Sequence, residues 1–293
     1  MRATAILGLG CSPKDLRPFQ TVSTIDWQLG MPASTDDADA ILLFGGDGTI
    51  HRHLGHLVQL GLPVLIVPAG SGNDFANSLG LRRVRDSLNA WKSFCQGAQN
   101  VRAIDLGIIT PLADDPRNPI PGTTYFCCAA GVGLDCEVAR RANNLPRWLR
   151  GHGGYALSVI RTIPSFAPFP MKLTTRNDEG HWIVGRNGPT MLAVFTNTPF
   201  YGGGMKVAPH ASMNDALLDI CVVEGLHPFR LVRIFPTVYA GRHLKVKEVH
   251  YFQTQAVRVE TEHTSDVYAD GEYVCQTPIE VSIQPSALKV ITF

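Results

Sequence analysis

The first hundred residues alternate continuous apolar runs with stretches in which apolar residues recur at helical spacing. The continuous runs predict strands buried on both faces, and they cover residues 3–9, 40–44, 63–67 and 101–109. The spaced stretches predict helices at 49–60, from about residue 75, and at 84–96. Strands that alternate with helices in this way form a parallel sheet with right-handed crossovers. Ligands of such sheets bind at the carboxyl ends of the strands.

Beyond residue 110 the pattern changes to short β-like runs separated by turn residues, which predicts an antiparallel sandwich or barrel. The runs cover residues 125–130, 171–176, 190–196, 218–223, 256–261 and 279–284. Helices are predicted near 153–163 and 229–239. We therefore expect an α/β domain at 1–109 and a β-sandwich domain at 110–293, with the last strand a candidate to return to the first domain.

Composition narrows the class of protein. A length of 293 residues is about twice the common domain size of ~150 residues, which agrees with two domains. The 26 Lys and Arg side chains nearly balance 25 Asp and Glu, giving a net charge of +1, which argues against a nucleic-acid partner bound through bulk charge. The seven cysteines are odd in number and include no C-x-x-C pair, so a reducing cytoplasm is expected. We interpret residues 3–9 as a strand and not as a signal peptide.

Two glycine-rich loops follow the neighbouring strands 40–44 and 63–67. The first loop consists of Gly45, Gly46, Asp47, Gly48 and Thr49. The second consists of Gly70, Ser71, Gly72, Asn73 and Asp74. Glycines let backbone N–H groups approach a phosphate, and a following helix adds its positive end. An ordinary tight turn or helix cap accounts for either loop alone, but two caps at one sheet edge are harder to explain.

With residues 68–76, these loops resemble the catalytic domain of diacylglycerol and sphingosine kinases, and most closely the bacterial soluble lipid kinases. The first motif is shared with NAD kinases and phosphofructokinases, whereas the second is much more specific. The resemblance continues through 104–107, 151–155, 197–219 and 270–272. It departs from the family at 9–13, where the usual first phosphate loop is shortened. Other departures are His51, Arg52 and Ala216.

The resemblance implies a Rossmann-like nucleotide-binding domain similar to that of NAD kinase and phosphofructokinase. It also implies an enzyme that uses Mg²⁺ and transfers the γ-phosphoryl group of ATP to a lipid alcohol. Asp47 would act in catalysis on the metal and nucleotide side, supported by Asp105, and Glu272 would be the general base. Thr49, Ser71 and Asn73 would donate hydrogen bonds to the phosphates. The resemblance also implies a structural Mg²⁺ at Asp215, with the carbonyls of Ser212 and Leu217.

The acceptor lipid is not specified by these motifs. Arginines within residues 138–163 suggest a transient contact with a membrane surface, or else a solvated helix face. Four aromatic residues are candidates for an acyl cleft or for core packing, namely Phe166, Phe169, Phe200 and Tyr201. The expected partners are ATP, a lipid alcohol, the membrane surface and a second copy of the chain. An NAD kinase-like enzyme and a binding protein without catalysis remain the alternatives.

Overall fold

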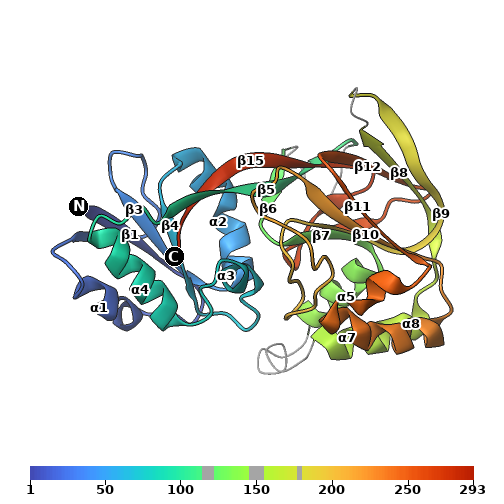
Figure 1. Ribbon diagram of the computed structural model, residues 1–293, viewed down its shortest axis with the longest axis horizontal. Coiled ribbons are helices and arrows are strands. Elements are labelled where there is room, and N and C mark those ends of the chain that lie inside the picture. Colours follow the sequence, from blue (N-terminus) through green and yellow to red (C-terminus); the bar gives the residue numbers. More distant parts are fainter. Residues whose placement is uncertain (114–121, 145–154, 177–179) are drawn as a thin grey trace. The chain divides into compact units, whose positions relative to one another are not determined.

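A computed structural model describes residues 1–113, 122–144, 155–176 and 180–293. The chain forms two compact units, Met1–Asp105 with Pro285–Phe293, and Leu106–Gln284. The boundary expected after residue 109 lies inside β5 (Val101–Pro111), which runs from the first unit into the second (Figure 1). β15 (Ile279–Ile291) likewise runs through both units, so the last strand does return to the first.

The first unit contains a parallel sheet in the order β15-β4-β3-β1-β2. Its strands besides β15 are β1 (Arg2–Leu7), β2 (Asp26–Leu29), β3 (Ala40–Gly45) and β4 (Val64–Pro68). Every residue of β3 and β4 is buried, as their continuous apolar sequences predict. Gly45 of β3 pairs with Pro68 of β4, so both strands end at the same level and their following loops start side by side.

The helices of this unit are α1 (Pro13–Gln20), α2 (Asp47–Leu60), α3 (Asp74–Ser78) and α4 (Val84–Cys95). Helix α2 begins two residues before the predicted start because Gly46 is extended and serves as its N-cap. It ends at Gly61, whose left-handed φ of 60° makes a glycine the natural C-cap. Helix α3 has only five residues, so the helix expected after residue 75 is a single turn.

The second unit is mainly an antiparallel β structure with strand order β14-β13-β7-β9-β8-β12-β15. Its strands besides β5 and β15 are β6 (Thr124–Phe126), β7 (Ala129–Gly133), β8 (Phe169–Arg176), β9 (Trp182–Thr196), β10 (Leu218–Glu224), β11 (Val249–Thr254), β12 (Ala256–Thr261), β13 (Asp266–Ala269) and β14 (Glu272–Gln276). β10 pairs with β9 and β11, and β5 pairs with β15 and β6. Inward side chains of these strands form one hydrophobic core that includes Phe126, Phe195 and Val259.

Helical segments accompany this β structure (Figure 1). They are α5 (Leu134–Asn143), α7 (Tyr155–Thr162), η2 (Ile163–Ser165), α8 (Pro228–Ile234), η3 (Phe235–Ala240) and η4 (Arg242–Lys245). The helices predicted at 153–163 and 229–239 correspond to α7 with η2 and to α8 with η3, whereas α5 was not predicted. Residues 151–154 of the Gly-rich segment lie outside the described residues. None of the helices in the described ranges is long and apolar enough to span a membrane.

The strand predicted at 125–130 is wrong in one respect, because the structure splits it into β6 and β7. The break falls at Cys127 and Cys128, whose backbone N–H groups donate to the carboxylate of Asp270 at 2.9 and 2.8 Å. A buried carboxylate that accepts from successive N–H groups draws them away from a strand ladder. No local sequence pattern indicates this distant partner.

Candidate functional site

The two glycine loops touch through their backbones. A Cβ on Gly70 would lie 2.4 Å from the Cα of Gly46, and a Cβ on Gly46 would lie 2.8 Å from the Cα of Gly70. Real Cβ atoms do not approach backbone so closely, so both positions require glycine. The N–H of Ala69 also donates to the carbonyl of Gly45 at 3.0 Å. The structure thus brings together the two loops that the sequence assigned to one edge of the sheet.

Asp47 joins the two loops. Its carboxylate accepts the backbone N–H of Asp74 and that of Phe75, each at 3.1 Å. These are the first N–H groups of α3, so Asp47 caps a helix that follows the other loop. Asp47 therefore has a structural role in addition to any role toward a metal ion.

Thr49 packs against glycines at the ends of two strands. A Cβ on Gly45 would lie 2.6 Å from the Thr49 Cβ, and one on Gly8 would lie 2.9 Å from the Thr49 Oγ1. Gly8 follows β1 and donates its N–H to the Phe44 carbonyl at 2.7 Å. The shortened loop after β1 therefore reaches the same sheet edge, and sequence reasoning missed Gly8. Gly8 lies inside the predicted strand 3–9, and as the single glycine of that apolar run it was the available signal.

The second loop is closed by its own asparagine. The Asn73 side chain accepts the N–H of Gly70 through Oδ1 and donates to the Gly70 carbonyl through Nδ2, both at 2.8 Å. Asn73 adopts a left-handed φ of 57°. Its amide thus shapes the loop, and the phosphate-donor role expected for it stays a prediction. Ser71 is exposed, whereas Asp74 is buried at the start of α3.

Asp105 lies on β5, which pairs with β15, and β15 in turn pairs with β4. Its carboxylate is only 3% exposed and accepts the N–H of Ser286 at 2.8 Å. Ser286 has a left-handed φ of 52°, so this bond stabilises an irregular point in β15. β15, which lies between β5 and β4, thus fixes the position of the Asp105 side chain.

The turn that carries Glu272 is fixed at two points. Asp270 is 8% exposed and its carboxylate accepts the N–H groups of Cys127, Cys128 and Ala129 at 2.9, 2.8 and 3.2 Å. Asp270 also donates its own N–H to the Ala129 carbonyl at 2.9 Å. Three consecutive N–H groups around one carboxylate form an anion-binding nest.

The other fixed point is Gly271, whose carbonyl accepts the Asn143 side-chain N–H from the end of α5 at 2.7 Å. Asp270 and Gly271 have left-handed φ values of 49° and 87°, which reverse the chain between β13 and β14. Glu272 is the first residue of β14 and is half-buried. Sequence reasoning missed the roles of Asp270 and Asn143, because their partners lie far away along the chain.

The expected structural metal site lies in a turn before β10. The Asp215 carboxylate accepts the N–H of Leu217 at 3.1 Å, and Ser212 Oγ donates to the Asn214 side chain at 2.6 Å. Ala216 has a left-handed φ of 59°, a conformation that favours glycine.

The neighbouring Asp219 is fully buried, and its Oδ1 accepts a hydrogen bond from Tyr251. Its Oδ2 has no hydrogen-bond partner among the described residues. Burial, together with the charge of Asp215, raises the pKa of Asp219. An orphaned buried carboxylate oxygen beside another carboxylate fits a hard divalent cation. The donor set at Asp215, with the Ser212 and Leu217 carbonyls, is therefore compatible with Mg²⁺.

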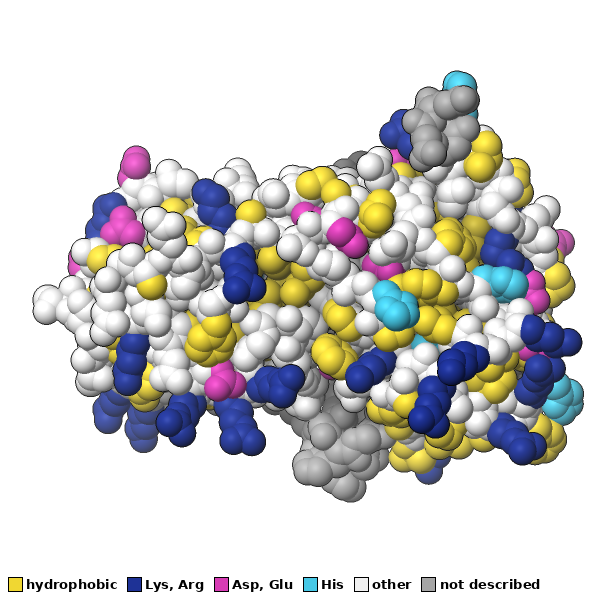
Figure 2. Space-filling view, viewed as in Figure 1, with side chains coloured by type: hydrophobic (Ala, Val, Ile, Leu, Met, Phe, Trp, Pro, Cys, Tyr) yellow, Lys and Arg dark blue, Asp and Glu magenta, His cyan; other side chains and the backbone are white. Residues whose placement is uncertain are grey.

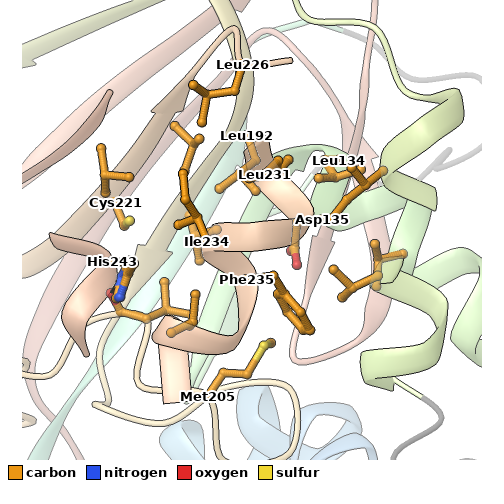
Figure 3. A pocket seen from close by; sticks show the side chains of 18 of the residues that line it. Leu134, Asp135, Leu192, Met205, Cys221, Leu226, Leu231, Ile234, Phe235 and His243 are labelled. Atoms are coloured by element: carbon orange, nitrogen blue, oxygen red, sulfur yellow. Dashed lines mark hydrogen bonds between the residues drawn. The ribbon is translucent and has the colours of Figure 1, made fainter. Parts of the chain in front are cut away.

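A largely apolar cavity lies within the second unit (Figure 3). Its empty space is about 730 Å³, which includes a part that is open to solvent. Its walls come from α5, α7, β9, β10, α8 and η3, and include Leu134, Leu192, Leu231, Ile234 and Phe235. Of the four aromatic residues expected at an acyl cleft, only Tyr201 is among the lining residues; Phe166, Phe169 and Phe200 are not.

A few polar groups interrupt this apolar lining. The Tyr201 hydroxyl donates to the Asp135 carboxylate at 2.9 Å. His243 is buried, with Nε2 3.0 Å from the Val207 carbonyl, and burial lowers its pKa. Burial also raises the pKa of the Cys221 thiol to about 12, so this thiol is a neutral part of the wall. Sequence reasoning missed Asp135 and His243, because neither stands in a recognisable motif.

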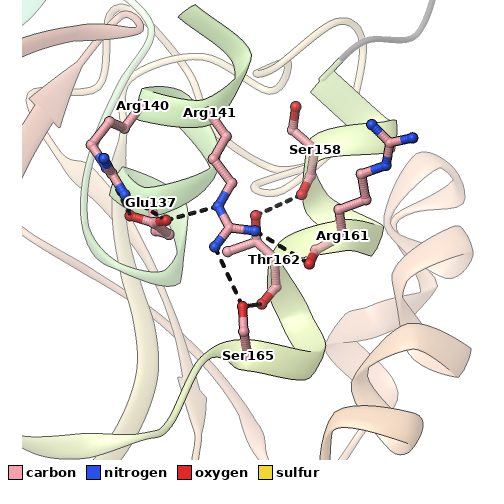
Figure 4. Close-up of polar contacts among 7 residues, drawn as sticks. All are labelled: Glu137, Arg140, Arg141, Ser158, Arg161, Thr162 and Ser165. Atoms are coloured by element: carbon pink, nitrogen blue, oxygen red, sulfur yellow. Dashed lines mark hydrogen bonds and ion pairs between the residues drawn. The ribbon is translucent and has the colours of Figure 1, made fainter. Parts of the chain in front are cut away.

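Two of the arginines expected to face a membrane, Arg140 and Arg141, form ion pairs within the protein. Arg140 and Arg141 both bind Glu137 at 2.8 Å (Figure 4). Arg141 also donates to the Arg161 carbonyl and to Ser165 Oγ, at 3.3 and 3.4 Å, and so ties α5 to α7 and η2. The predicted residues Arg147 and Arg150 lie outside the described residues. Arg140 and Arg141 therefore have a structural role, whereas the Arg161 side chain is exposed.

Comparison with known proteins assigns the chain to a family. Residues 27–109 match the diacylglycerol kinase catalytic domain, and residues 128–292 match the YegS C-terminal NAD kinase beta sandwich-like domain. A diacylglycerol kinase of Mycobacterium tuberculosis is 35% identical over 253 residues, which cover 86% of this chain and 76% of that protein. A diacylglycerol kinase of Bacillus subtilis (strain 168) is 28% identical over 250 residues, covering 85% and 76% of the two chains.

The fold has a counterpart among solved structures. The crystal structure of a diacylglycerol kinase from Bacillus anthracis str. Sterne superimposes with a TM-score of 0.67 at 18% identity, covering 100% of this chain and 96% of that one. This supports an N-terminal α/β domain followed by a β-sandwich-like domain. On these matches the chain belongs to the diacylglycerol kinase-like family of bacterial lipid kinases, and it is a kinase whose acceptor is a lipid alcohol.

Proposed function

We propose that this lipid kinase transfers the γ-phosphoryl group of ATP to the hydroxyl of a diacylglycerol-like lipid. The observation that carries the proposal is the backbone contact between Gly46 and Gly70 at the carboxyl ends of two adjacent parallel strands. Loops that meet without side chains present backbone N–H groups to one region, and the N-terminus of α2 adds partial positive charge there. Such a Rossmann-like edge is suited to a triphosphate.

In this reaction Glu272 acts on the lipid hydroxyl, and the aspartates act on the metal side. Glu272 takes the proton of the lipid hydroxyl as the bond between that oxygen and the γ-phosphorus forms. The bond from the γ-phosphorus to the bridging oxygen breaks at the same time, and ADP leaves. Asp47 would hold Mg²⁺ at the nucleotide, with Asp105 supporting the same metal–water network, and the ion would neutralise phosphate charge there. Asp215 with the Ser212 and Leu217 carbonyls would hold a structural Mg²⁺.

The apolar cavity supports a lipid acceptor. Its lining suits an acyl chain, whose burial is favourable at about 0.8 kcal/mol per CH₂ group. The dinucleotide of an NAD kinase-like enzyme is polar throughout and would leave its hydrogen-bonding groups unpaired against such a wall. The Asp135–Tyr201 pair is a polar point in the wall where a head group or hydroxyl would be accommodated.

The test uses ATP labelled in its γ-phosphate, with diacylglycerol and NAD as competing acceptors. We expect the label in phosphatidic acid. The Glu272→Gln variant should lose about 10²–10⁴-fold in kcat, the contribution typical of a positioned general base. Glu262→Gln, which changes an exposed carboxylate in the same unit, is the matched control and should retain activity. Label in NADP, or an active Glu272→Gln variant, would refute the proposal.

A further inference from the structure

The segment 225–247 carries a strong local excess of positive charge. It contains five Lys and Arg residues and no Asp or Glu, although the whole chain has 26 basic and 25 acidic residues. The five are Arg230, Arg233, Arg242, Lys245 and Lys247. They lie on or next to α8 and η4, which η3 connects. A cluster of positive charge on a nearly neutral protein marks a surface that suits a negatively charged partner.

Ion pairs within the protein neutralise only part of this positive charge. Glu248 binds Arg230 at 2.6 Å, and Lys247 approaches the same carboxylate at 3.9 Å. The other three cations, Arg233, Arg242 and Lys245, are exposed, and within the described ranges no carboxylate pairs with them. Their charge is therefore available to an external anionic partner.

An exposed aromatic side chain accompanies these cations. Phe229 is 83% exposed at the start of α8, where its ring stacks on His227 with centroids 5.6 Å apart. Single exposed apolar residues are common on protein surfaces. A bulky aromatic next to unpaired cations is instead typical of helices that lie in a membrane interface, where the ring enters the acyl boundary and the cations meet head groups.

The same elements wall the apolar cavity with their inner sides. Leu231, Ile234 and Phe235 of α8 and η3 line it, as Figure 3 shows, while Arg230 and Arg233 on the other side of α8 are exposed. Figure 2 shows Lys and Arg side chains gathered around apolar ones on the side of this unit where Figure 1 draws α7 and α8. One thin layer of chain thus separates the cationic surface from the cavity.

We propose that the α8–η4 surface, formed by Phe229, Arg233, Arg242 and Lys245, binds the face of an anionic lipid bilayer. The choice of a bilayer over another polyanion rests on the proposed function, because a lipid acceptor has to pass from a bilayer to the cavity behind this layer. Each cation near an anionic membrane contributes about fivefold to binding, so loss of three should weaken it by roughly two orders of magnitude.

The experiment measures sedimentation of the full-length protein with vesicles, in the absence of nucleotide and acceptor. Vesicles of phosphatidylcholine alone are compared with vesicles of phosphatidylcholine and phosphatidylglycerol in equal parts, at low and high salt. One variant combines Arg233→Ala, Arg242→Ala and Lys245→Ala. Its matched control removes three exposed cations from the other unit, at Arg82, Arg85 and Lys92. Phe229→Ser tests the aromatic contribution.

We expect wild type to bind only the anionic vesicles, with binding weakened by salt. The α8–η4 triple variant should lose roughly 100-fold in affinity, while the control triple should bind like wild type. Phe229→Ser should weaken binding at low and at high salt. Melting temperature and activity on a short-chain, monomeric diacylglycerol should stay unchanged in all variants.

Undiminished vesicle binding by the α8–η4 triple variant, or an equal loss in the control triple, would overturn the proposal. Tighter binding of wild type to RNA than to anionic vesicles would overturn the assignment to a bilayer. Because binding is measured without nucleotide, a failure here leaves the proposed reaction unaffected. Conversely, absence of phosphoryl transfer would leave the vesicle result intact.

Discussion

The carboxylate of Asp270 offers the most demanding test of how the Glu272 turn is built. In Asp270→Asn the side chain keeps its shape, but one acceptor oxygen becomes an NH₂ donor. That NH₂ group would face either the N–H of Cys127 or those of Cys128 and Ala129, which now donate at 2.8–3.2 Å. The variant therefore loses at least one charge-assisted bond and leaves at least one buried N–H unsatisfied.

The size of the effect follows from these two losses. A hydrogen bond to a charged group contributes about 1.5–3 kcal/mol, and an unsatisfied buried donor costs about 1–3 kcal/mol. We therefore expect Asp270→Asn to lower the free energy of unfolding by roughly 3 kcal/mol. Because the turn leads directly into Glu272, kcat should fall about tenfold or more, while KM for ATP changes little.

The assay is urea unfolding followed by tryptophan fluorescence, combined with steady-state kinetics. Asp266→Asn is the matched control, since Asp266 lies at the other end of β13 and is half-buried. It accepts the Gln276 side-chain N–H at 3.3 Å. The control should cost no more than about 1 kcal/mol. An Asp270→Asn protein with wild-type unfolding and kcat would show that the nest does not hold the turn.

Three further outcomes are expected. Gly70→Ala places a Cβ 2.4 Å from the Cα of Gly46, so ATP binding measured by calorimetry should be lost. The control Gly55→Ala has open space around its new Cβ and should bind ATP normally. Because Gly55 lies inside a helix, this control should also gain up to about 1 kcal/mol in stability. Ala216→Gly relieves a left-handed φ of 59° and should raise the free energy of unfolding in urea by about 0.5–1 kcal/mol; a loss would contradict this account. Burial lowers the pKa of His243 in the folded protein below its usual value of 6.5. As the pH falls from 6.5 toward this lower pKa, the His243 imidazole takes up a proton only in the unfolded state. The free energy of unfolding should therefore decrease over this pH range. His243→Gln should remove that part of the pH dependence, and an unchanged pH profile would refute it.

Much of the architecture of the first unit followed from local sequence. The strands at 40–44 and 63–67 were correctly predicted because residues buried on both faces of a parallel sheet must be apolar without interruption. The glycine loops after them were also placed correctly, since consecutive parallel strands bring their carboxyl ends to one edge. That two glycines are needed for direct backbone contact became visible only in the structure.

The roles of several polar residues were less predictable. Asn73 was expected to donate to a phosphate, and the structure adds that its amide closes its own loop, a role that the sequence did not indicate. Arg140 and Arg141 were candidates for a membrane contact, but Glu137 binds both. In each case the residue type suggested a chemistry, and the nearest partner in space decided how it is used.

By itself, the sequence determined the order of strands and helices and the two glycine loops, because apolar periodicity and backbone freedom act over a few neighbouring residues. Tertiary structure alone decided which carboxylate holds which turn. Asp270 meets the backbone of Cys127 across 143 residues of chain, and no local pattern encodes such a pairing. The cavity and the cationic surface outside it likewise exist only once α8 is packed, since packing determines which of its sides is buried and which meets solvent.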